Sequence, residues 1–304
     1  MLALALAVLG APAAAQEAVR YRDANGQWIY TDHSGARTDT PGESLNLPPP
    51  AQTNPRIEVR RTDDGTLTRV VATNHYLCPV TVRARIEEST FPEVRAGVAY
   101  YKELAAGATE TLVQTHDPAS GNAVLKFHWD SSLGSASIQH HPERPYRAPF
   151  ALGATFPVSQ AYPTAITHGS PDSRFAVDIV LPDGTPVYAA RAGRVIDLRH
   201  DAFIGALDPT LLDRANVVEI LHDDGTIAVY AHLHWDSIRV RIGQQVVRGE
   251  YIADSGNTGF TSGPHLHFAV WRNSAAGELA VPVSFEGPGG VAVTPQTGGE
   301  LTAY

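Results

Sequence analysis

The sequence predicts an all-β protein in which an N-terminal β-sandwich-like domain is followed by a Gly-rich antiparallel β domain. Short runs rich in β-branched residues recur along the chain, and clusters of Gly, Pro, Asn and Asp separate them. No long segment with helical periodicity lies between the runs of the first domain. With 304 residues, 43% of them hydrophobic and 18% charged, the chain is long enough for about two domains.

The first 15 residues have the composition of a secretory signal peptide. Residues 2–9 form an unbroken run of Leu, Ala and Val, and the small residues of 10–15 follow it. This order predicts a signal peptide that is cleaved after Ala15. The apolar run is far shorter than the ~20 residues that a membrane span needs. A buried N-terminal helix is the alternative interpretation, but we expect an exported protein without a stable membrane span.

Residues 16–45 predict a small β-hairpin module. Alternating apolar residues flank Asn25-Gly26, a dipeptide favoured in two-residue hairpin turns. The segment resembles the Trp/Tyr-bearing hairpin module of unknown function at the start of many Gram-negative envelope proteins, which implies a periplasmic location. Residues 46–56 contain three consecutive prolines and predict an extended, semi-rigid linker.

Residues 57–147 predict the β-sandwich-like accessory domain. Its β-type runs lie at residues 57–59, 67–71, 80–86, 110–113 and 125–129. Cys78 is the single cysteine and cannot form an intrachain disulfide, so we expect a buried free thiol. We expect no catalytic constellation in this domain. His140-His141 lies in a polar turn before Pro142 and is interpreted as solvated.

Residues 148–287 predict a second all-β domain with tight turns. Glycine stands at almost every junction between its predicted strands, which lie at residues 176–181, 186–190, 193–198, 216–222, 227–232, 245–247, 250–255 and 265–271. Residues 201–214 interrupt this order and predict a loop with a helical turn. Residues 288–304 are interpreted as a C-terminal tail.

The charge of the chain excludes one class of partner. Its formal net charge is -9 and its pI is about 5.8. Binding to nucleic acid depends on clustered Lys and Arg that neutralise phosphates. We therefore expect no nucleic-acid partner, and the oligomeric state stays open.

Two histidines separated by one residue, His265 and His267, are the strongest local signal of chemistry. They lie in an apolar run that predicts a strand, so both side chains project from one face, about 6.5 Å apart. Imidazoles held on a rigid strand suit a metal-centred hydrolytic site. A hydrogen-bond ladder at a strand edge is the alternative.

Three further polar side chains lie in or beside apolar strands of the same domain, namely His168, Asp178 and His232. A carboxylate in mid-strand is costly to bury unless it is paired or binds a cation. Asp178 is therefore interpreted as a turn cap, as an ion-pair partner of Arg174, or as a metal ligand. Alone, His168 fits a loop histidine and His232 a core histidine bonded to the backbone. Together with the His-x-His pair, they offer the nitrogen and oxygen ligands that hold catalytic zinc.

Four groups of residues in this domain resemble, in order, the motifs of the lysostaphin/LytM-type zinc metallopeptidases. The groups are Pro186-Val187-Tyr188-Ala189-Ala190 with Gly193-Arg194-Val195, Tyr230-Ala231-His232-Leu233, Gly256-Asn257-Thr258-Gly259, and Gly263-Pro264-His265-Leu266-His267-Phe268. The resemblance covers roughly residues 165–285. It implies a duplicated-hybrid-motif β fold for the second domain and one Zn²⁺ per chain.

The resemblance also assigns roles to five residues. The implied zinc ligands are His168, Asp178 and His267, and the implied catalytic histidines are His232 and His265. The commonest family pattern places the first ligand four residues before the aspartate, where this chain has Arg174. His168 precedes Asp178 by ten residues, as in a subgroup with an expanded loop.

These roles imply a zinc metalloendopeptidase. Zinc with three protein ligands keeps one position open for water, whose pKa falls towards ~7. We expect His265 to help deprotonate that water and His232 to bond the oxyanion or assist the leaving amine, although the two roles stay interchangeable. Family members cut peptide cross-links of peptidoglycan, so we expect a periplasmic murein endopeptidase acting on stem peptides. A pentaglycine bridge fits this location less well.

Two other functions fit parts of the sequence. Some proteins with this domain have lost zinc ligands and activate cell-wall amidases as exported regulators, but all five positions are occupied by competent residues here. Residues 243–250 also suit the barrel-sandwich fold of phosphoryl or acyl carriers. A carrier needs no aspartate ligand and no signal segment, so both features argue against it.

Overall fold

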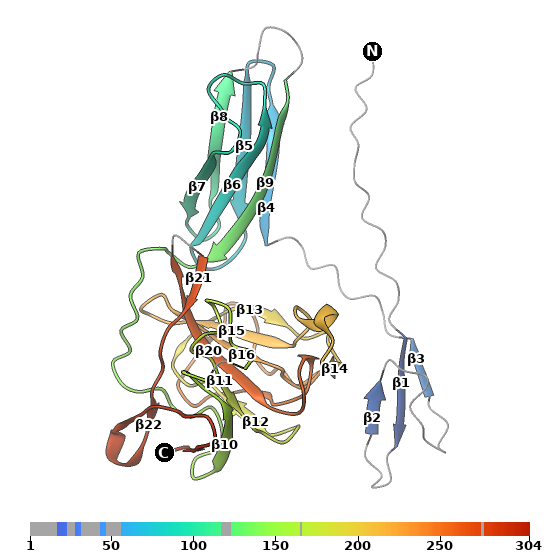
Figure 1. The fold of residues 1–304 in the computed structure, drawn as a ribbon, viewed down its shortest axis with the longest axis vertical. Helices are drawn as coiled ribbons and strands as arrows, with labels where there is room; N and C mark the ends of the chain where they lie inside the picture. Colours follow the sequence, from blue (N-terminus) through green and yellow to red (C-terminus); the bar gives the residue numbers. More distant parts are fainter. Residues whose placement is uncertain are drawn as a thin grey trace. The chain divides into compact units, whose positions relative to one another are not determined.

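The computed structural model describes residues 17–22, 28–31, 43–46, 56–116, 123–164, 166–274 and 277–304 (Figure 1). The chain divides into two compact units, Met1–Asn54 and Pro55–Tyr304. Across the described residues the regular elements are β-strands and two short 3-10 turns, which confirms the all-β prediction. No helix within these ranges has the length and apolar character needed to cross a membrane.

The first unit contains one antiparallel sheet. Its strands have the order β2-β1-β3, with bounds β1 Glu17–Arg22, β2 Trp28–Thr31 and β3 Glu43–Asn46. The predicted signal peptide, the Asn25-Gly26 turn and residues 47–55 of the predicted linker lie outside the described residues.

The second unit begins with two three-stranded sheets, ordered β4-β5-β8 and β7-β6-β9. Their bounds are β4 Ile57–Asp63, β5 Leu67–Asn74, β6 Val80–Ser89, β7 Ala99–Leu104, β8 Thr109–His116 and β9 Leu125–Leu133. Val70 and Val113 of one sheet share an apolar cluster with Ile86 and Leu125 of the other. This is the sandwich-like arrangement that the sequence predicts. Strand β7 was not predicted, because most of its residues are exposed and show no apolar alternation.

The rest of the second unit is built on a nine-stranded sheet, ordered β17-β13-β15-β16-β20-β11-β10-β24, with β21 added to β20. The bounds are β10 Thr155–Gln160, β11 Val177–Ile179, β13 Gly193–Arg199, β15 Val217–Leu221, β16 Ile227–Ala231, β17 Gln245–Val246, β20 Leu266–Ser274, β21 Gly277–Ala280 and β24 Glu300–Thr302. Strand β24 pairs with β10 and buries Leu301, so residues of the predicted tail close one edge of the sheet.

Three two-stranded sheets are separate from the nine-stranded sheet. They are β12 Pro186–Tyr188 with β18 Tyr251–Asp254, β14 Gly205–Ala206 with β19 Gly259–Phe260, and β22 Phe285–Glu286 with β23 Ala292–Val293. The β14–β19 pair is parallel, unlike the antiparallel pairing predicted for this domain. The short 3-10 turn η1 Pro209–Leu211 confirms the helical turn predicted within residues 201–214, and η2 Pro288–Gly290 precedes β23.

Close backbone contact docks the 201–214 insertion against the segment that contains β19. A Cβ on Gly205 would lie 1.8 Å from the Asn257 carbonyl oxygen, and Gly259 has a φ of +82° with backbone of Ala215 2.7 Å from its would-be Cβ. Both positions therefore require glycine. The insertion is therefore held against the segment that carries β19 and is not a free loop.

The sandwich packs directly on the nine-stranded sheet. Cys78 and Val80 share an apolar cluster with Ile227 and Trp271, and the Asn273 amide donates to a hydroxyl and a carbonyl of the sandwich. Cys78 is fully buried, which confirms the prediction of a buried free thiol. Because side chains of β20 alternate, Trp271 lies on the same face as the histidine four residues earlier, about 13 Å away. The predicted boundary between residues 147 and 148 stays a prediction.

Candidate functional site

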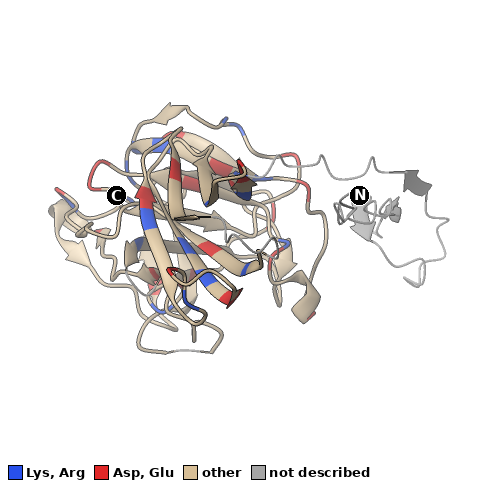
Figure 2. Cartoon of the chain, turned by 90° about the horizontal axis from the view of Figure 1, so that it is seen from above, with Lys and Arg blue, Asp and Glu red and all other residues tan. Residues whose placement is uncertain are grey.

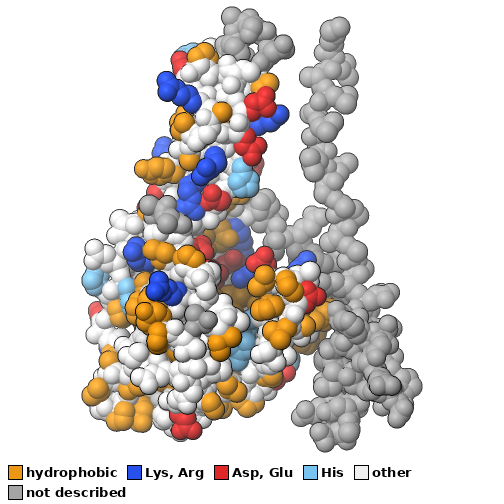
Figure 3. All heavy atoms as spheres, in the orientation of Figure 1, with side chains coloured by type: hydrophobic (Ala, Val, Ile, Leu, Met, Phe, Trp, Pro, Cys, Tyr) orange, Lys and Arg blue, Asp and Glu red, His pale blue; other side chains and the backbone are white. Residues whose placement is uncertain are grey.

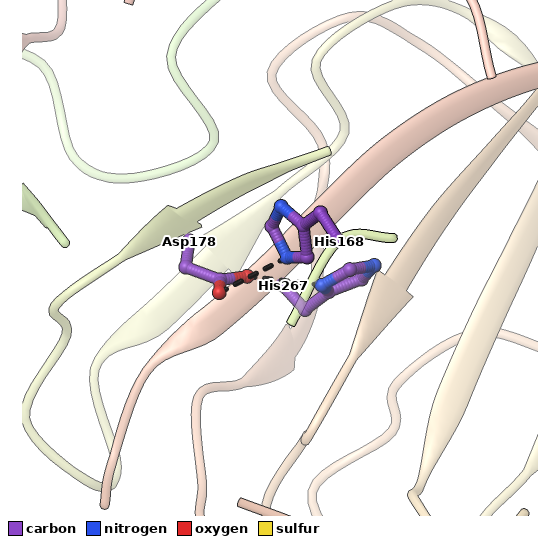
Figure 4. Close-up of side chains that lie close together, drawn as sticks. All are labelled: His168, Asp178 and His267. Carbon is purple, nitrogen blue, oxygen red and sulfur yellow. Dashed lines mark hydrogen bonds and ion pairs between the residues drawn. The ribbon is translucent and has the colours of Figure 1, made fainter. Parts of the chain in front are cut away.

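Three neighbouring strands bring the polar side chains of the site together. Asp178 on β11 is paired in register with His267 on β20, and His267 is paired on its other side with Ala231 of β16. His232 directly follows Ala231. Since paired residues of adjacent strands point to the same face, the sheet itself places Asp178 beside His267. Figure 4 shows their side chains together with that of His168.

His168, Asp178 and His267 form a compact group of possible metal ligands. One donor atom from each lies within 4.8 Å of the others. The His267 Nδ1 is 2.9 Å from Asp178 Oδ1, and the His168 Nε2 is 3.1 Å from Asp178 Oδ2 (Figure 4). The alternative ion pair of Asp178 is not observed, because the Arg174 guanidinium lies over the Tyr162 ring.

The donor set fits a zinc ion. His168 is 4% exposed, yet neither of its ring nitrogens has a hydrogen-bond partner in the described structure, because the contact with Asp178 lacks hydrogen-bond angles. Burying a polar atom without a partner costs free energy. A metal ion bound to one His168 ring nitrogen would remove part of that cost. Two imidazoles and a carboxylate are the ligands of many catalytic zinc sites.

The electrostatics of the group favour an ionised carboxylate. Burial alone would raise the pKa of Asp178, but the adjacent imidazoles of His168 and His267 lower it more, and the pKa lies well below its usual range. The carboxylate is therefore negative at neutral pH. It can neutralise half the charge of a divalent cation.

Two further histidines lie beside this group with defined tautomers. The Nδ1 of His232 is 2.7 Å from the Thr258 carbonyl oxygen, and the Nδ1 of His265 is 2.9 Å from the Gly263 carbonyl oxygen. A carbonyl only accepts, so in each neutral ring Nδ1 donates and Nε2 keeps its lone pair. The two rings are 4.5 Å apart between centroids. Each neutral ring therefore offers one lone pair, on Nε2.

Burial keeps one of these rings neutral. Desolvation, followed by the nearby His265 and His267, lowers the pKa of His232 to about 3. His232 also has a φ of +61°, an uncommon conformation for a residue other than glycine. This local backbone strain turns the chain away from β16 at the point where the site begins.

All five predicted site residues line one cavity of about 520 Å³, which we call the histidine groove. Leu207 and Leu212 of the insertion form part of its wall and are 65% and 63% exposed. Arg199 and Asp213 supply charges of both signs. Figure 3 shows hydrophobic side chains in small surface groups among charged ones, and Figure 2 shows basic and acidic residues interspersed along the described strands. The lining suits a chain with both apolar and polar groups.

The structure adds one residue that the sequence did not single out. Gln160, at the end of β10, is 3% exposed and its amide nitrogen donates to Asp178 Oδ2 at 3.1 Å. A lone glutamine at a strand end carries no motif. Only its register position opposite Asp178 reveals the contact.

Comparison with known proteins decides the nature of this region. Residues 173–278 match the model of peptidase family M23. The chain contains an M23 peptidase domain. The matched residues include Asp178, His232, His265 and His267, whereas His168 lies five residues before the M23 match begins.

Curated relatives share this M23 domain over part of their length. Peptidoglycan DD-endopeptidase ShyA of Vibrio cholerae is 40% identical over 93 residues, which are 31% of this chain and 19% of ShyA. Lysostaphin of Staphylococcus simulans is 28% identical over 151 residues, 47% of this chain and 28% of lysostaphin. Cell division protein DipM of Caulobacter vibrioides is 34% identical over 107 residues, 35% of this chain and 16% of DipM. The chain thus matches less than a third of the length of each of these relatives.

Proposed function

We propose that this chain is a zinc-dependent endopeptidase that hydrolyses peptide cross-links of bacterial peptidoglycan. The observation that carries the proposal is the histidine groove itself. Three side chains suited to zinc lie beside two histidines whose Nε2 atoms are free of hydrogen-bond partners among the described residues. That division of five residues into binding and proton-handling groups is what metal-assisted peptide hydrolysis requires.

The zinc ligands would be His168, Asp178 and His267. Zinc bound there would polarise the scissile carbonyl and lower the pKa of a water molecule. His265 has its Nε2 3.8 Å from Asp178 Oδ1, close enough to that centre to accept a proton from the attacking water. His232 is neutral at rest, with a lone pair on Nε2. It would donate to the leaving amine, or bond the developing oxyanion, only once a proton had been transferred to that nitrogen.

The substrate class follows from the relatives and from the chain's predicted location. ShyA is named a peptidoglycan endopeptidase, and the first 15 residues predict export. An exported protein with a Gram-negative hairpin module would act in the periplasm, on stem peptides cross-linked between glycan strands. The groove's apolar rim at Leu207 and Leu212 supports a peptide rather than a highly charged ligand.

An exported regulator that activates a cell-wall amidase is the second candidate. One relative, DipM, is named a cell division protein rather than a peptidase. A regulator needs the fold but not the five polar side chains, and burying His168 without a partner would only lower its stability. The complete set of side chains therefore favours the enzyme.

The test is zinc content and turnover of purified peptidoglycan by the full chain. We expect about one zinc per chain, as three side chains form a single ligand group, and new stem-peptide ends among the released muropeptides. Protein that binds no zinc, leaves peptidoglycan intact and stimulates a purified amidase would support the regulator instead.

A further inference from the structure

We infer that Gln160 is a positioning residue that joins two of the proposed zinc ligands into one unit. The inference rests on the proposed zinc site but concerns a residue outside the M23 match, which begins at residue 173. Gln160 touches neither the substrate space nor a catalytic histidine in the described contacts. It acts through Asp178 and through the loop that carries His168.

One amide group makes four hydrogen bonds to these two elements. Its Oε1 accepts from the backbone N–H groups of Ile166 and Thr167 at 2.7 and 2.8 Å. Its Nε2 donates to the Thr167 hydroxyl at 2.9 Å and to Asp178 Oδ2 at 3.1 Å. With both amide atoms used and only 3% of the residue exposed, the side chain has one possible orientation.

The loop needs such an anchor because no hydrogen bond among the described residues holds the His168 ring. Neither His168 ring nitrogen has a hydrogen-bond partner in the described residues, and the 3.1 Å contact of its Nε2 with Asp178 Oδ2 lacks hydrogen-bond angles. His168 directly follows Thr167, whose backbone and side chain are both bonded to Gln160. Ile166 is 75% exposed and contributes little packing. The Gln160 amide therefore fixes the backbone from which the ligand projects.

The same amide orients the carboxylate. His267 contacts Asp178 Oδ1 while Gln160 donates to Asp178 Oδ2, so the two oxygens are distinguished by their partners. Hydrogen bonds to ligating carboxylates fix their orientation and commonly change metal affinity by about 10- to 100-fold. His168 lies ten residues before Asp178, outside the strand that carries Asp178. A separate contact is therefore needed to hold the two ligands in a fixed relative position.

The decisive measurement is the zinc dissociation constant of the full chain, obtained by competition with a chromophoric chelator. Gln160→Met keeps the volume but removes all four hydrogen bonds, and we expect zinc binding about 10- to 100-fold weaker. We also expect an altered visible spectrum of the cobalt-loaded protein. With peptidoglycan as substrate, kcat should fall while KM changes less than about twofold, because the residue supports the reacting centre rather than substrate binding.

Gln160→Glu separates the two contacts. It keeps an acceptor for the Ile166 and Thr167 N–H groups, but replaces the amide donor to Asp178 Oδ2 by a carboxyl oxygen, which repels Asp178 unless the two groups share a proton. We expect a folded protein with about tenfold weaker zinc binding. This variant decides the question if Gln160→Met does not fold.

Gln244→Met is the matched control. Gln244 also uses both amide atoms, donating to Glu250 Oε1 at 2.9 Å and accepting from the Arg241 N–H at 3.2 Å, but it does not line the histidine groove. Its zinc affinity should equal that of the wild type. Wild-type affinity in both Gln160 variants would overturn the inference. A wild-type chain that binds zinc but leaves peptidoglycan intact would refute the proposed function alone, and one that binds no zinc would refute both.

Discussion

Two cavities of similar size differ in how their polar groups are satisfied. The histidine groove has a volume of about 520 Å³, and a second cavity at the other end of β15 has a volume of about 560 Å³. We call the second the arginine cavity, after the residues Arg144, Arg191, Arg194 and Arg248 in its lining. No residue lines both cavities among those described. Size therefore does not identify the functional site.

The buried charges of the arginine cavity are paired within the protein. Arg191 bonds Asp224 at 2.8 Å and also contacts Asp223, while Arg248 contacts Glu286. Asp224 further accepts from a backbone N–H and from the Thr226 hydroxyl. Such pairs hold together the segments that form the cavity, although two buried nitrogens of its lining, Arg248 Nε and His222 Nε2, have no hydrogen-bond partner among the described residues.

The histidine groove differs because its unbonded ring nitrogens gather around one carboxylate, with His168 Nε2 and His265 Nε2 at 3.1 and 3.8 Å from Asp178. His168 lacks hydrogen-bond partners in the described structure, and His232 and His265 each leave one nitrogen unused. Functional groups kept available in this way lower stability and are retained for chemistry. Substitutions in the groove should therefore cost activity, and those in the arginine cavity should cost stability.

Loss of a proposed zinc ligand should have the largest effect. In His267→Ala we expect bound zinc to be lost and kcat/KM on peptidoglycan to fall at least about 10³-fold, because Lewis-acid stabilisation contributes several kcal/mol. Metal analysis and muropeptide release measure the two quantities. Arg194→Ala in the arginine cavity is the control and should keep wild-type zinc and turnover. Full zinc content in His267→Ala would contradict the assignment of this ligand.

The two proposed proton-handling histidines should separate catalysis from metal binding. We expect His265→Ala and His232→Ala to keep zinc but to lose about 10²- to 10⁴-fold in kcat, the range of general acid–base catalysis. Single-turnover cleavage together with metal analysis makes the distinction. Cleavage at the wild-type rate by His265→Ala would show that this residue has no catalytic role.

Much of this arrangement could be predicted from the sequence, because its strands carry strong local patterns. The apolar runs around Asp178, His232 and the His-x-His pair indicate strands, and their side chains meet because those strands are neighbours in the sheet. The roles of these residues stay predictions until they are measured. Strand β24 could not be predicted, since its pairing with β10 joins residues nearly 150 positions apart.

The remaining features depend on contacts without a local pattern. Gln160 is an isolated polar residue, and its importance lies in bonds to a loop and to a neighbouring strand. The arginine cavity draws its lining from four separate segments, near residues 143–146, 190–194, 221–223 and 245–248. Sequence spacing cannot bring such segments together, because tertiary packing sets their positions.

Breaking the central ion pair of the arginine cavity should cost stability rather than activity. The side chains of Arg191 and Asp224 are only 14% and 9% exposed, so Arg191→Met leaves a carboxylate buried without its cation. We expect a loss of about 3 kcal/mol in the free energy of unfolding. Urea unfolding measures it, and turnover per zinc-loaded molecule should not change. Arg144→Met, an exposed position, should change stability by less than about 0.5 kcal/mol. Equal stabilities of the two variants would show that the pair contributes nothing.

A smaller, pH-dependent effect should come from His222, which also lines the arginine cavity. Burial lowers its pKa to about 4, from an ordinary value of 6.5. The unfolded chain therefore binds more protons than the folded chain between these values, and stability falls as the pH drops through them. From pH 7.5 to pH 5 we expect this residue to lower the free energy of unfolding by about 2 kcal/mol.

The control variant is His222→Asn. Its side chain can still donate to the Ala192 carbonyl, which His222 Nδ1 contacts at 2.8 Å, but it cannot titrate. Urea unfolding of the zinc-loaded proteins at both pH values should show that the variant loses about 2 kcal/mol less than the wild type. Parallel pH profiles would mean that His222 titrates alike in both states, and that acid sensitivity arises in the histidine groove instead.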